Sequence, residues 1–285
     1  MTVYIGTSGW QYRHWRGPFY PRRVRGLDDL AFFAERFQTV ELNGTFYKLP
    51  EAETFEDWAS RVPDGFVFAV KASRFLTHIK RLREPEEPVE RLMDRAEHLG
   101  KKLGPVLLQL PPQLRQDLGR LEATLEAFQN YARHSRRAGL KPAPTGRAEG
   151  RAHASVRVAV EFRHASWFTS ETREVLERHD AALCIADGTQ VGARHAVPLR
   201  TPEWRTADWG YLRFHGGTGS PASCYELSML RKRAGLVKRL WPRGDVYAYF
   251  NNDAHGCAIR DAAVFAEALR RRRVKVSRTP EPIEM

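Results

Sequence analysis

Eight short apolar runs, rich in β-branched and aromatic residues, alternate with longer amphipathic stretches along this chain of 285 residues. Apolar runs of this length predict strands, and apolar residues spaced three and four apart predict helices between them. Strands that alternate with helices pair in parallel through right-handed crossovers. We therefore predict an α/β fold, a (β/α)8 TIM barrel of parallel strands, which typically takes about 250 residues.

The expected elements can be placed by residue number. We predict strands at 3–5, 39–42, 66–70, 106–110, 156–160, 182–186, 210–214 and 246–250. We predict helices at 27–36, 55–61, 89–99, 118–133, 169–178, 225–240 and 261–271. An open, doubly wound sheet is the alternative, but no GxGxxG follows the first run, so the commonest ligand signature of that fold is missing.

Two segments depart from this rhythm. Residues 135–155 are rich in Arg, Ala, Gly and Pro and have no apolar period. We interpret them as a flexible, low-complexity insertion before the fifth strand of a single domain at 1–285. A basic arm that binds nucleic acid is the alternative interpretation. Residues 272–285 form a basic and polar tail.

The charge balance favours anionic partners. Forty-six Lys and Arg residues against 34 Asp and Glu residues give a formal net charge of +12. Such an excess is typical of proteins that bind nucleic acid or phosphorylated metabolites. A genome rich in G and C would also raise the arginine content with no functional cause.

Composition also bears on location. No run of about 18 apolar residues is present, so we expect no membrane partner, and the first residues do not read as a secretory signal. Cys184, Cys224 and Cys257 are far apart and have no CxxC spacing. We expect an odd, unpaired set of thiols in a reducing, cytoplasmic location.

Polar side chains end most of the predicted strands. Because side chains alternate faces along a strand, Glu161 and Arg163 share one side and Val160 and Phe162 the other. Burying so much charge for stability alone would cost several kcal/mol for each unpaired ion. We therefore predict a site at the carboxyl ends of the strands, where this fold carries its chemistry.

The residues predicted for this site fall into two groups. The candidate catalytic residues are Glu41, Glu161 and His215. The candidate substrate-binding residues are Thr7, Ser8, Trp10, Tyr12, Asn43, Tyr47, Lys71, Gln109, Arg163, His164, Asp187, Arg213, Asn251, Asn252 and Asp253. In the loop after the first strand, aromatic residues alternate with arginine, which suits stacking on bases or sugars beside phosphates. A hydrophobic plug over one end of the barrel is the alternative for this loop.

The mixture of cationic, imidazole and carboxylate groups favours an enzyme, possibly a hydrolase, acting on an anionic, phosphate-bearing substrate or nucleic acid. Lys71, Arg163 and Arg213 would hold the anion. Glu41 or Glu161 would act as general base, and His215 as acid.

Two other functions stay open. A carbohydrate-active hydrolase or isomerase would use Glu41 and Glu161 as its two carboxylates. In retaining glycosidases, the two catalytic carboxylates lie about 5 Å apart. The other open function is binding of nucleic acid without catalysis. We predict no cofactor and no resident metal, since no HxH or HExxH concentrates the candidate ligands; a divalent metal is the lesser alternative. The oligomeric state does not follow from the sequence.

Eight ordered blocks resemble the YecE-like proteins, a family catalogued as a domain of unknown function. The blocks are IGTSGW at 5–10, GPFYP at 17–21, VELNGTFYKLP at 40–50, VKASRFLTH at 70–78, LLQLPP at 107–112, VEFRHASW at 160–167, YLRFHG at 211–216 and YFNNDAHG at 249–256. The resemblance covers the chain apart from 135–155 and the tail. It implies a TIM barrel, and it supplies no activity. The likeness of such barrels to endonuclease IV and to xylose-isomerase-like enzymes is an analogy of fold only. This chain lacks the histidine-rich strand ends of a trinuclear zinc nuclease.

Overall fold

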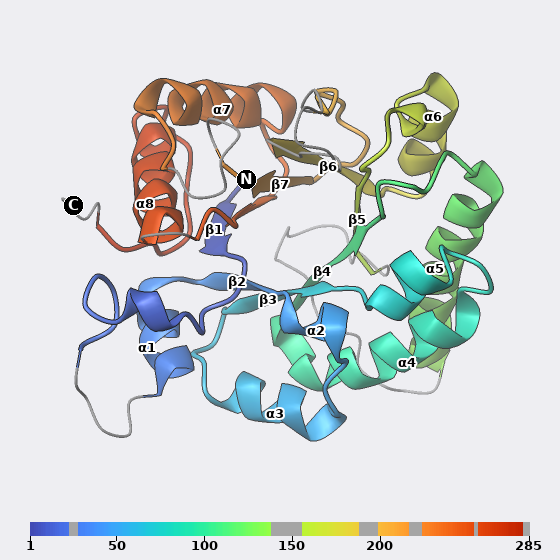
Figure 1. Ribbon diagram of the computed structural model, residues 1–285, viewed down its shortest axis with the longest axis horizontal. Coiled ribbons are helices and arrows are strands. Elements are labelled where there is room, and N and C mark those ends of the chain that lie inside the picture. The colour runs from blue at the N-terminus through green and yellow to red at the C-terminus, as the bar shows by residue number, and fades with distance from the viewer. Residues whose placement is uncertain (23–27, 138–155, 188–198, 217–223, 254–255, 282–285) are drawn as a thin grey trace. The chain divides into compact units, whose positions relative to one another are not determined.

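A computed structural model of the protein describes residues 1–22, 28–137, 156–187, 199–216, 224–253 and 256–281. In these residues eight strands form one sheet in the order β1-β8-β7-β6-β5-β4-β3-β2, with helices between them along the chain (Figure 1). Neighbouring strands run parallel, and an isolated parallel bridge joins Ser8, after β1, to Glu41 of β2. The predicted (β/α)8 TIM-barrel fold is confirmed.

The elements lie close to their predicted places. The strands are β1 (Val3–Thr7), β2 (Thr39–Leu42), β3 (Val67–Lys71), β4 (Leu103–Gln109), β5 (Val158–Glu161), β6 (Ala182–Asp187), β7 (Gly210–Phe214) and β8 (Val246–Phe250). The longer helices are α1 (Asp29–Arg36), α3 (Ala52–Ser60), α4 (Glu86–Ala96), α5 (Leu118–Arg137), α6 (Ser170–Arg178), α7 (Leu227–Leu240) and α8 (Cys257–Arg270). No helix in the described part of the chain has the length and apolar character needed to span a membrane.

Several short elements were not predicted. They are α2 (Gly44–Tyr47), the π-helical turn η2 (Phe75–Ile79) and the 3-10 turns η1 (Arg13–Trp15), η3 (Glu97–Lys102) and η4 (Ala165–Trp167). A helical period needs about two turns of sequence to show itself, and most of these are only three to five residues long. Two of them, α2 and η2, contribute residues to the candidate site.

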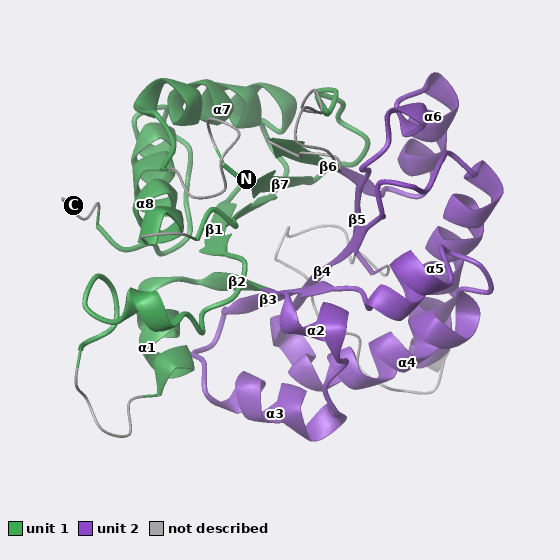
Figure 2. Ribbon diagram, viewed as in Figure 1, with its two compact units in different colours: residues 1–41, 184–285 green, residues 42–183 purple. Residues whose placement is uncertain are grey.

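The chain divides into two compact units (Figure 2). Unit 1 comprises residues 1–41 and 184–285, and unit 2 comprises residues 42–183. In unit 1, β8 pairs with both β1 and β7, and α7 packs against α8. In unit 2, β4 pairs with both β3 and β5, and α4 packs against α5. The prediction of a single domain stays a prediction.

The strands are buried on both faces, as parallel strands covered by helices are. Every residue of β8 is buried, and so is every residue of β7. Phe214 and Phe250 stack with ring centroids 4.2 Å apart, and both contact Phe265 of α8. These contacts explain why the strand sequences are continuous apolar and aromatic runs with little polar alternation before their carboxyl ends.

The expected boundaries of the two irregular segments need correction. Helix α5 continues to Arg137, so the insertion cannot begin at 135; residues 138–155 lie outside the described residues. Part of the expected tail belongs to the fold. The Val3 amide donates to the Lys275 carbonyl (2.9 Å), the Ser277 amide donates to the Val3 carbonyl (2.8 Å), and the Ser277 hydroxyl accepts from the Ile5 amide (3.0 Å).

The expectation of three unpaired cysteines is wrong. Cys224 and Cys257 form a disulfide, with their Cα atoms 4.8 Å apart, while Cys184 is free and buried. The pair is 33 residues apart in sequence and is brought together by the fold at the start of α8, so no local spacing signals it. The cysteines therefore give no support to a reducing compartment, and the cytoplasmic location stays a prediction.

Gly6 provides a test of the packing between β1 and β2. A Cβ atom at this position would lie 2.2 Å from the carbonyl oxygen of Thr39, which is backbone and cannot move aside. We expect Gly6→Ala to lower the free energy of unfolding by about 1–3 kcal/mol or more, the usual cost of overpacking.

The matched control is Gly235→Ala in the middle of α7, where the nearest atom is the end of the Arg272 side chain at 3.9 Å. Alanine there is expected to stabilise the protein by up to about 1 kcal/mol through helix propensity. Urea denaturation of both variants measures the difference. Equal stability of the two would contradict the close packing of Gly6 against the Thr39 carbonyl.

Candidate functional site

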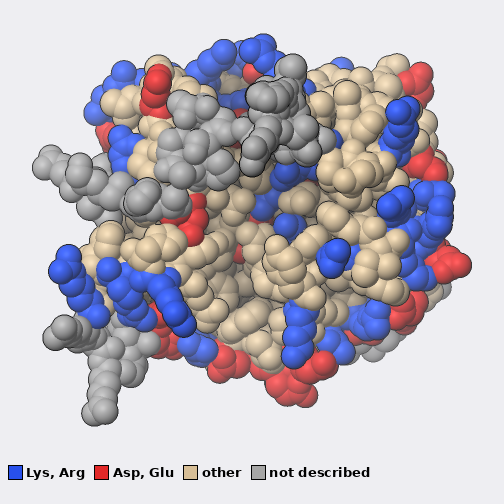
Figure 3. Space-filling model, viewed as in Figure 1, with Lys and Arg blue, Asp and Glu red and all other residues tan. Residues whose placement is uncertain are grey.

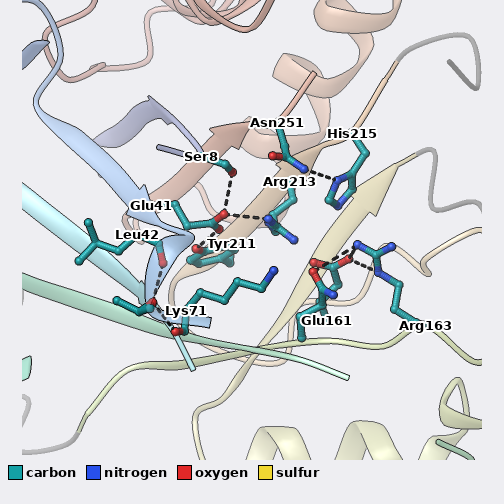
Figure 4. A network of polar contacts seen from close by, with 12 residues as sticks. Ser8, Glu41, Leu42, Lys71, Glu161, Arg163, Tyr211, Arg213, His215 and Asn251 are labelled. Atoms are coloured by element: carbon teal, nitrogen blue, oxygen red, sulfur yellow. Dashed lines mark hydrogen bonds and ion pairs between the residues drawn. The ribbon is translucent and has the colours of Figure 1, made fainter. Parts of the chain in front are cut away.

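A buried carboxylate in unit 1 is held by three donors (Figure 4). Glu41 Oε1 accepts from the Ser8 hydroxyl (2.6 Å) and from Arg213 Nη2 (2.8 Å). Glu41 Oε2 accepts from the Tyr211 hydroxyl (2.7 Å). Tyr211 and Arg213 are two apart on β7, so their side chains lie on the same face, as the alternation of strand residues requires.

This network has the character of a structural ion pair. Glu41 is fully buried and Arg213 is 1% exposed. Burial, and secondly the charge of Glu41, raise the pKa of Tyr211, so the phenol stays a hydrogen-bond donor. As a general base, Glu41 would have to accept a proton while it already accepts three hydrogen bonds. The network therefore assigns Glu41 to holding Arg213, and its predicted catalytic role stays untested.

Unit 2 presents a different set of groups at the end of β3. The hydroxyl of Thr45 lies 2.7 Å from the carbonyl oxygens of both Leu42 and Lys71, which fixes α2 against the end of the strand. As a result the ammonium of Lys71 lies 4.4 Å from the ring centroid of Phe46, a cation–π contact. Lys71 is the last residue of β3, as its predicted role in the site requires.

Arg163 is positioned by residues of two paired strands in unit 2. Its Nε donates to Glu161 Oε1 (2.5 Å), and its Nη2 lies 3.4 Å from Gln109 Oε1 (Figure 4). Gln109 and Glu161 are direct neighbours in the register of β4 and β5. Glu161 is buried, whereas the Arg163 side chain is 18% exposed. The carboxylate and the amide therefore hold a guanidinium that still reaches solvent.

His78 reports the electrostatic character of this region. It lies in the π-helical turn η2, and its Nδ1 is 2.9 Å from the Thr77 hydroxyl. Burial lowers the pKa of His78 to about 4, and the positive charges of Lys71, Arg74 and Arg163 add to the shift. The imidazole is therefore neutral at pH 7. We name Lys71, Arg74 and Arg163, whose charges act on His78, the cationic cluster.

A second titratable group lies at the carboxyl ends of β6, β7 and β8 in unit 1. Asp187 Oδ1 accepts from the Tyr225 hydroxyl (2.6 Å) and from the His215 amide (3.0 Å). Burial raises the pKa of Asp187 above its usual value, and these two hydrogen bonds oppose the shift. The Asn251 amide nitrogen is 3.3 Å from His215 Nδ1. The predicted residues His215, Asp187 and Asn251 are thus neighbours.

The aromatic loop after β1 is largely packed away. Trp15 and Tyr20 are buried, and the Trp15 indole donates to Asp253 Oδ1 (2.7 Å). The Tyr12 hydroxyl donates to the Ser8 carbonyl (2.5 Å), and the Trp10 side chain is buried. These contacts favour the hydrophobic-plug alternative over stacking for this loop.

Three other predicted contacts use their polar atoms within the protein. Thr7 donates to the Gly9 carbonyl, Asn252 donates to Asp261, and His164 Nδ1 accepts from the Ser166 amide, capping η4. Two differ: Tyr47 is 82% exposed, and the buried Oδ1 of Asn43, at the start of α2, has no hydrogen-bond partner among the described residues. The assignment of all these residues to substrate binding stays a prediction.

Three residues of the cationic cluster and its surroundings were missed by sequence reasoning. They are Phe46, Arg74 and His78, which come from the short turns that follow β2 and β3. The parity of strand residues, on which the prediction rested, does not extend into such turns. Their one signal in the sequence was their presence in the blocks VELNGTFYKLP and VKASRFLTH.

Neither a group of metal ligands among the described residues nor a basic patch on the face in Figure 3 marks a site. Within the residues that the structure describes, no group of three or more His, Cys, Asp and Glu side chains could hold a metal ion. Lys and Arg side chains are scattered among neutral and acidic ones on the face in Figure 3. The absence of a resident metal and of a cofactor stays a prediction.

Comparisons with known proteins agree on one family. A family model described as "Protein of unknown function DUF72" matches residues 4–284, including the insertion and most of the tail. The UPF0759 protein YunF of Bacillus subtilis is 27% identical over 228 residues, 75% of this chain and 70% of its own. The UPF0759 protein YecE of Escherichia coli K12 is 32% identical over 110 residues, 38% of each chain.

Solved structures show the same fold. A crystal structure of a DUF72 family protein from Thermotoga maritima is similar with a TM-score of 0.73 and 26% identity, over 95% of this chain and all of that one. A DUF72 family protein from Enterococcus faecalis is similar with a TM-score of 0.74 and 16% identity, over 99% of this chain and all of that one.

The ion pair between Glu41 and Arg213 yields a stability prediction. Removing one partner of a buried pair leaves the other charge uncompensated, at a cost of about 3–5 kcal/mol. We expect Arg213→Met to lower the free energy of unfolding by this amount. The double variant Glu41→Gln/Arg213→Met should lose less, because the neutral amide can still accept from Ser8 and Tyr211.

The control is Arg61→Met, which removes an exposed ion pair with Asp57 at 2.8 Å and should cost at most about 1 kcal/mol. Urea denaturation distinguishes these cases. If Arg213→Met proved as mild as the control, or the double variant worse than the single one, the buried pair would not be what stabilises these strands.

Proposed function

The chain belongs to DUF72, a family of proteins of unknown function, and from the site geometry we propose that it is an enzyme acting on an anionic, phosphate-bearing ligand. The observation that carries the proposal is the geometry of the cationic cluster: the Lys71 ammonium and the His78 ring both contact Phe46, and Glu161 holds a part-exposed Arg163 guanidinium. Positive charges that disfavour a proton on His78 favour an anion beside it. We infer that the phosphate group binds at the cationic cluster.

The groups of the cluster suit a phosphate. A guanidinium offers a planar fork of donors to phosphate oxygens, and an ammonium offers a compact point charge. Glu161 and Gln109 hold the guanidinium of Arg163 in place before any ligand arrives. Such preorganisation is what electrostatic stabilisation of a developing charge requires.

Acid–base chemistry has two candidates in the same unit. His78 is neutral at pH 7, and a bound anion would raise its pKa, so the imidazole could then carry a proton to a leaving group. Glu161 is as buried as Glu41, but its partner Arg163 belongs to the cluster and reaches solvent, and we propose Glu161 as the general base for a ligand that engages Arg163. His215 remains the acid predicted from the sequence, with Asp187 and Asn251 beside it in unit 1.

The carbohydrate alternative has less support. It needs both Glu41 and Glu161 as acid and base or nucleophile. Glu41 is fully buried and already accepts hydrogen bonds from Ser8, Tyr211 and Arg213. A carboxylate so engaged is a poor proton carrier, which favours the phosphate-bearing ligand. Nucleic acid is one source of such a phosphate, and binding without turnover would be the non-catalytic alternative.

The pKa of His78 measures occupancy of the cluster directly. We expect NMR titration of the imidazole to give a pKa of about 4 in the free protein and a higher pKa when inorganic phosphate is present. Lys71→Met should raise the pKa of His78 without ligand and weaken phosphate binding by about 1.5–3 kcal/mol, the range for hydrogen bonds to charged groups.

Lys80→Met is the control, since Lys80 directly follows η2, is paired with Glu84 four residues later and is not one of the charges given above for His78. It should leave both the pKa of His78 and phosphate affinity unchanged. A His78 signal that phosphate does not move in the wild-type protein would refute the anion site.

Turnover tests the enzymatic part of the proposal. We expect slow hydrolysis by the purified protein, which releases inorganic phosphate from a monoester or an alcohol and a monoester from a diester. Glu161→Gln should lower the rate roughly 10²–10⁴-fold, the usual contribution of a general base. Glu161→Gln should still bind phosphate, because Gln can accept from Arg163. Phosphate binding with no turnover of any ester would establish the non-catalytic alternative instead.

A further inference from the structure

Exposed hydrophobic side chains gather beside the cationic cluster. Among the described residues, the large hydrophobic side chains left exposed are Tyr47 (82%), Ile79 (62%) and Leu227 (47%). Tyr47 ends α2, and Ile79 follows His78 directly in η2. Two of the three thus flank the same few residues in unit 2. Single exposed hydrophobic residues are ordinary, but two beside a charged site indicate a contact surface.

Phe46 connects Tyr47 to the cationic cluster. The Phe46 ring centroid is 4.4 Å from the Lys71 ammonium and 4.9 Å from the His78 ring centroid. The Tyr47 ring centroid lies 5.0 Å from that of Phe46, with the two planes at 89°. Phe46 is buried, so its own ring offers little surface to a ligand. Tyr47 therefore presents the accessible aromatic face one ring away from the lysine and the histidine.

The backbone that carries Tyr47 is fixed. The Thr45 hydroxyl contacts the carbonyls of Leu42 and Lys71, the Phe46 amide donates to the Asn43 carbonyl (3.2 Å), and the Lys48 amide donates to the Gly44 carbonyl (3.2 Å). The helix is thus tied to the ends of β2 and β3. An exposed aromatic ring on an anchored turn is ordered in advance of binding, which lowers the entropic cost of stacking on it.

We propose that the ligand of this site is a nucleotide, whose phosphate lies at the cationic cluster and whose base stacks on Tyr47. The inference rests on the proposed function, which supplies the phosphate. A base has an aromatic face that stacks on tyrosine, whereas a sugar phosphate has none.

Two kinds of molecule present the same base and phosphate: a free nucleotide and single-stranded nucleic acid. Calorimetric titrations with adenosine monophosphate, ribose 5-phosphate and a short single-stranded oligoadenylate separate them. Each titration is repeated with Tyr47→Ala, with Tyr47→Phe and with Leu227→Ala as the exposed control in unit 1. The His78 NMR signal is followed in parallel, because it reads phosphate occupancy independently of the base.

We expect adenosine monophosphate to bind more tightly than ribose 5-phosphate. Tyr47→Ala should lower the affinity for adenosine monophosphate by about 5- to 150-fold, the range for loss of one base stack. It should leave the affinity for ribose 5-phosphate unchanged. Tyr47→Phe, which keeps the ring, and Leu227→Ala should retain wild-type affinity. An oligoadenylate that binds more tightly than the monophosphate, and weakens equally with Tyr47→Ala, would also support the proposal and identify nucleic acid as the source.

Equal affinity for adenosine monophosphate and ribose 5-phosphate, or no selective effect of Tyr47→Ala, would overturn the nucleotide proposal. In that case a shifted His78 signal would leave the phosphate site standing. If none of the three ligands moves the His78 signal, the proposed function itself fails. The two failures are therefore distinguishable from the same samples.

Discussion

Two opposite charges buried together hold unit 1 around its first strands. The carboxylate of Glu41 and the guanidinium of Arg213 come from β2 and β7, and both are almost completely removed from water. Each charge would cost several kcal/mol if buried alone. The ion pair, with the hydroxyls of Ser8 and Tyr211 added, offsets that cost and joins segments far apart in the sequence.

In unit 2 the same types of side chain are arranged differently. Arg163 is held by Glu161 and Gln109 but keeps contact with solvent, and Lys71 lies over an aromatic ring. Burial lowers the pKa of His78, and these charges add to the shift, so the imidazole is neutral. Similar polar strand ends thus form a closed ion pair in unit 1 and a part-exposed group of cations in unit 2.

The sequence predicts an element when its hydrophobic pattern is long enough to show a period. Runs such as 246–250 are long enough to predict strands, and parity along them placed Glu41, Lys71 and Glu161 at the site. Parity could not show that Glu41 would be paired and buried, because its partner Arg213 is 172 residues away. The turns that carry Phe46 and His78 are too short to show a period. The disulfide between Cys224 and Cys257 depends on the meeting of distant segments and has no local pattern.

The discontinuity of unit 1 sets an order of events during synthesis. Strand β1 is made before β8, with which it pairs, and before residues 275–277, which it contacts. At about 5–20 residues per second, β1 waits roughly 10–50 s for these partners. During that time its unpaired edge is a template for other strands. Unit 2 is continuous at 42–183 and is fully synthesised long before then. The newly made chain therefore passes through a stage in which one half can fold while the other still needs protection from aggregation.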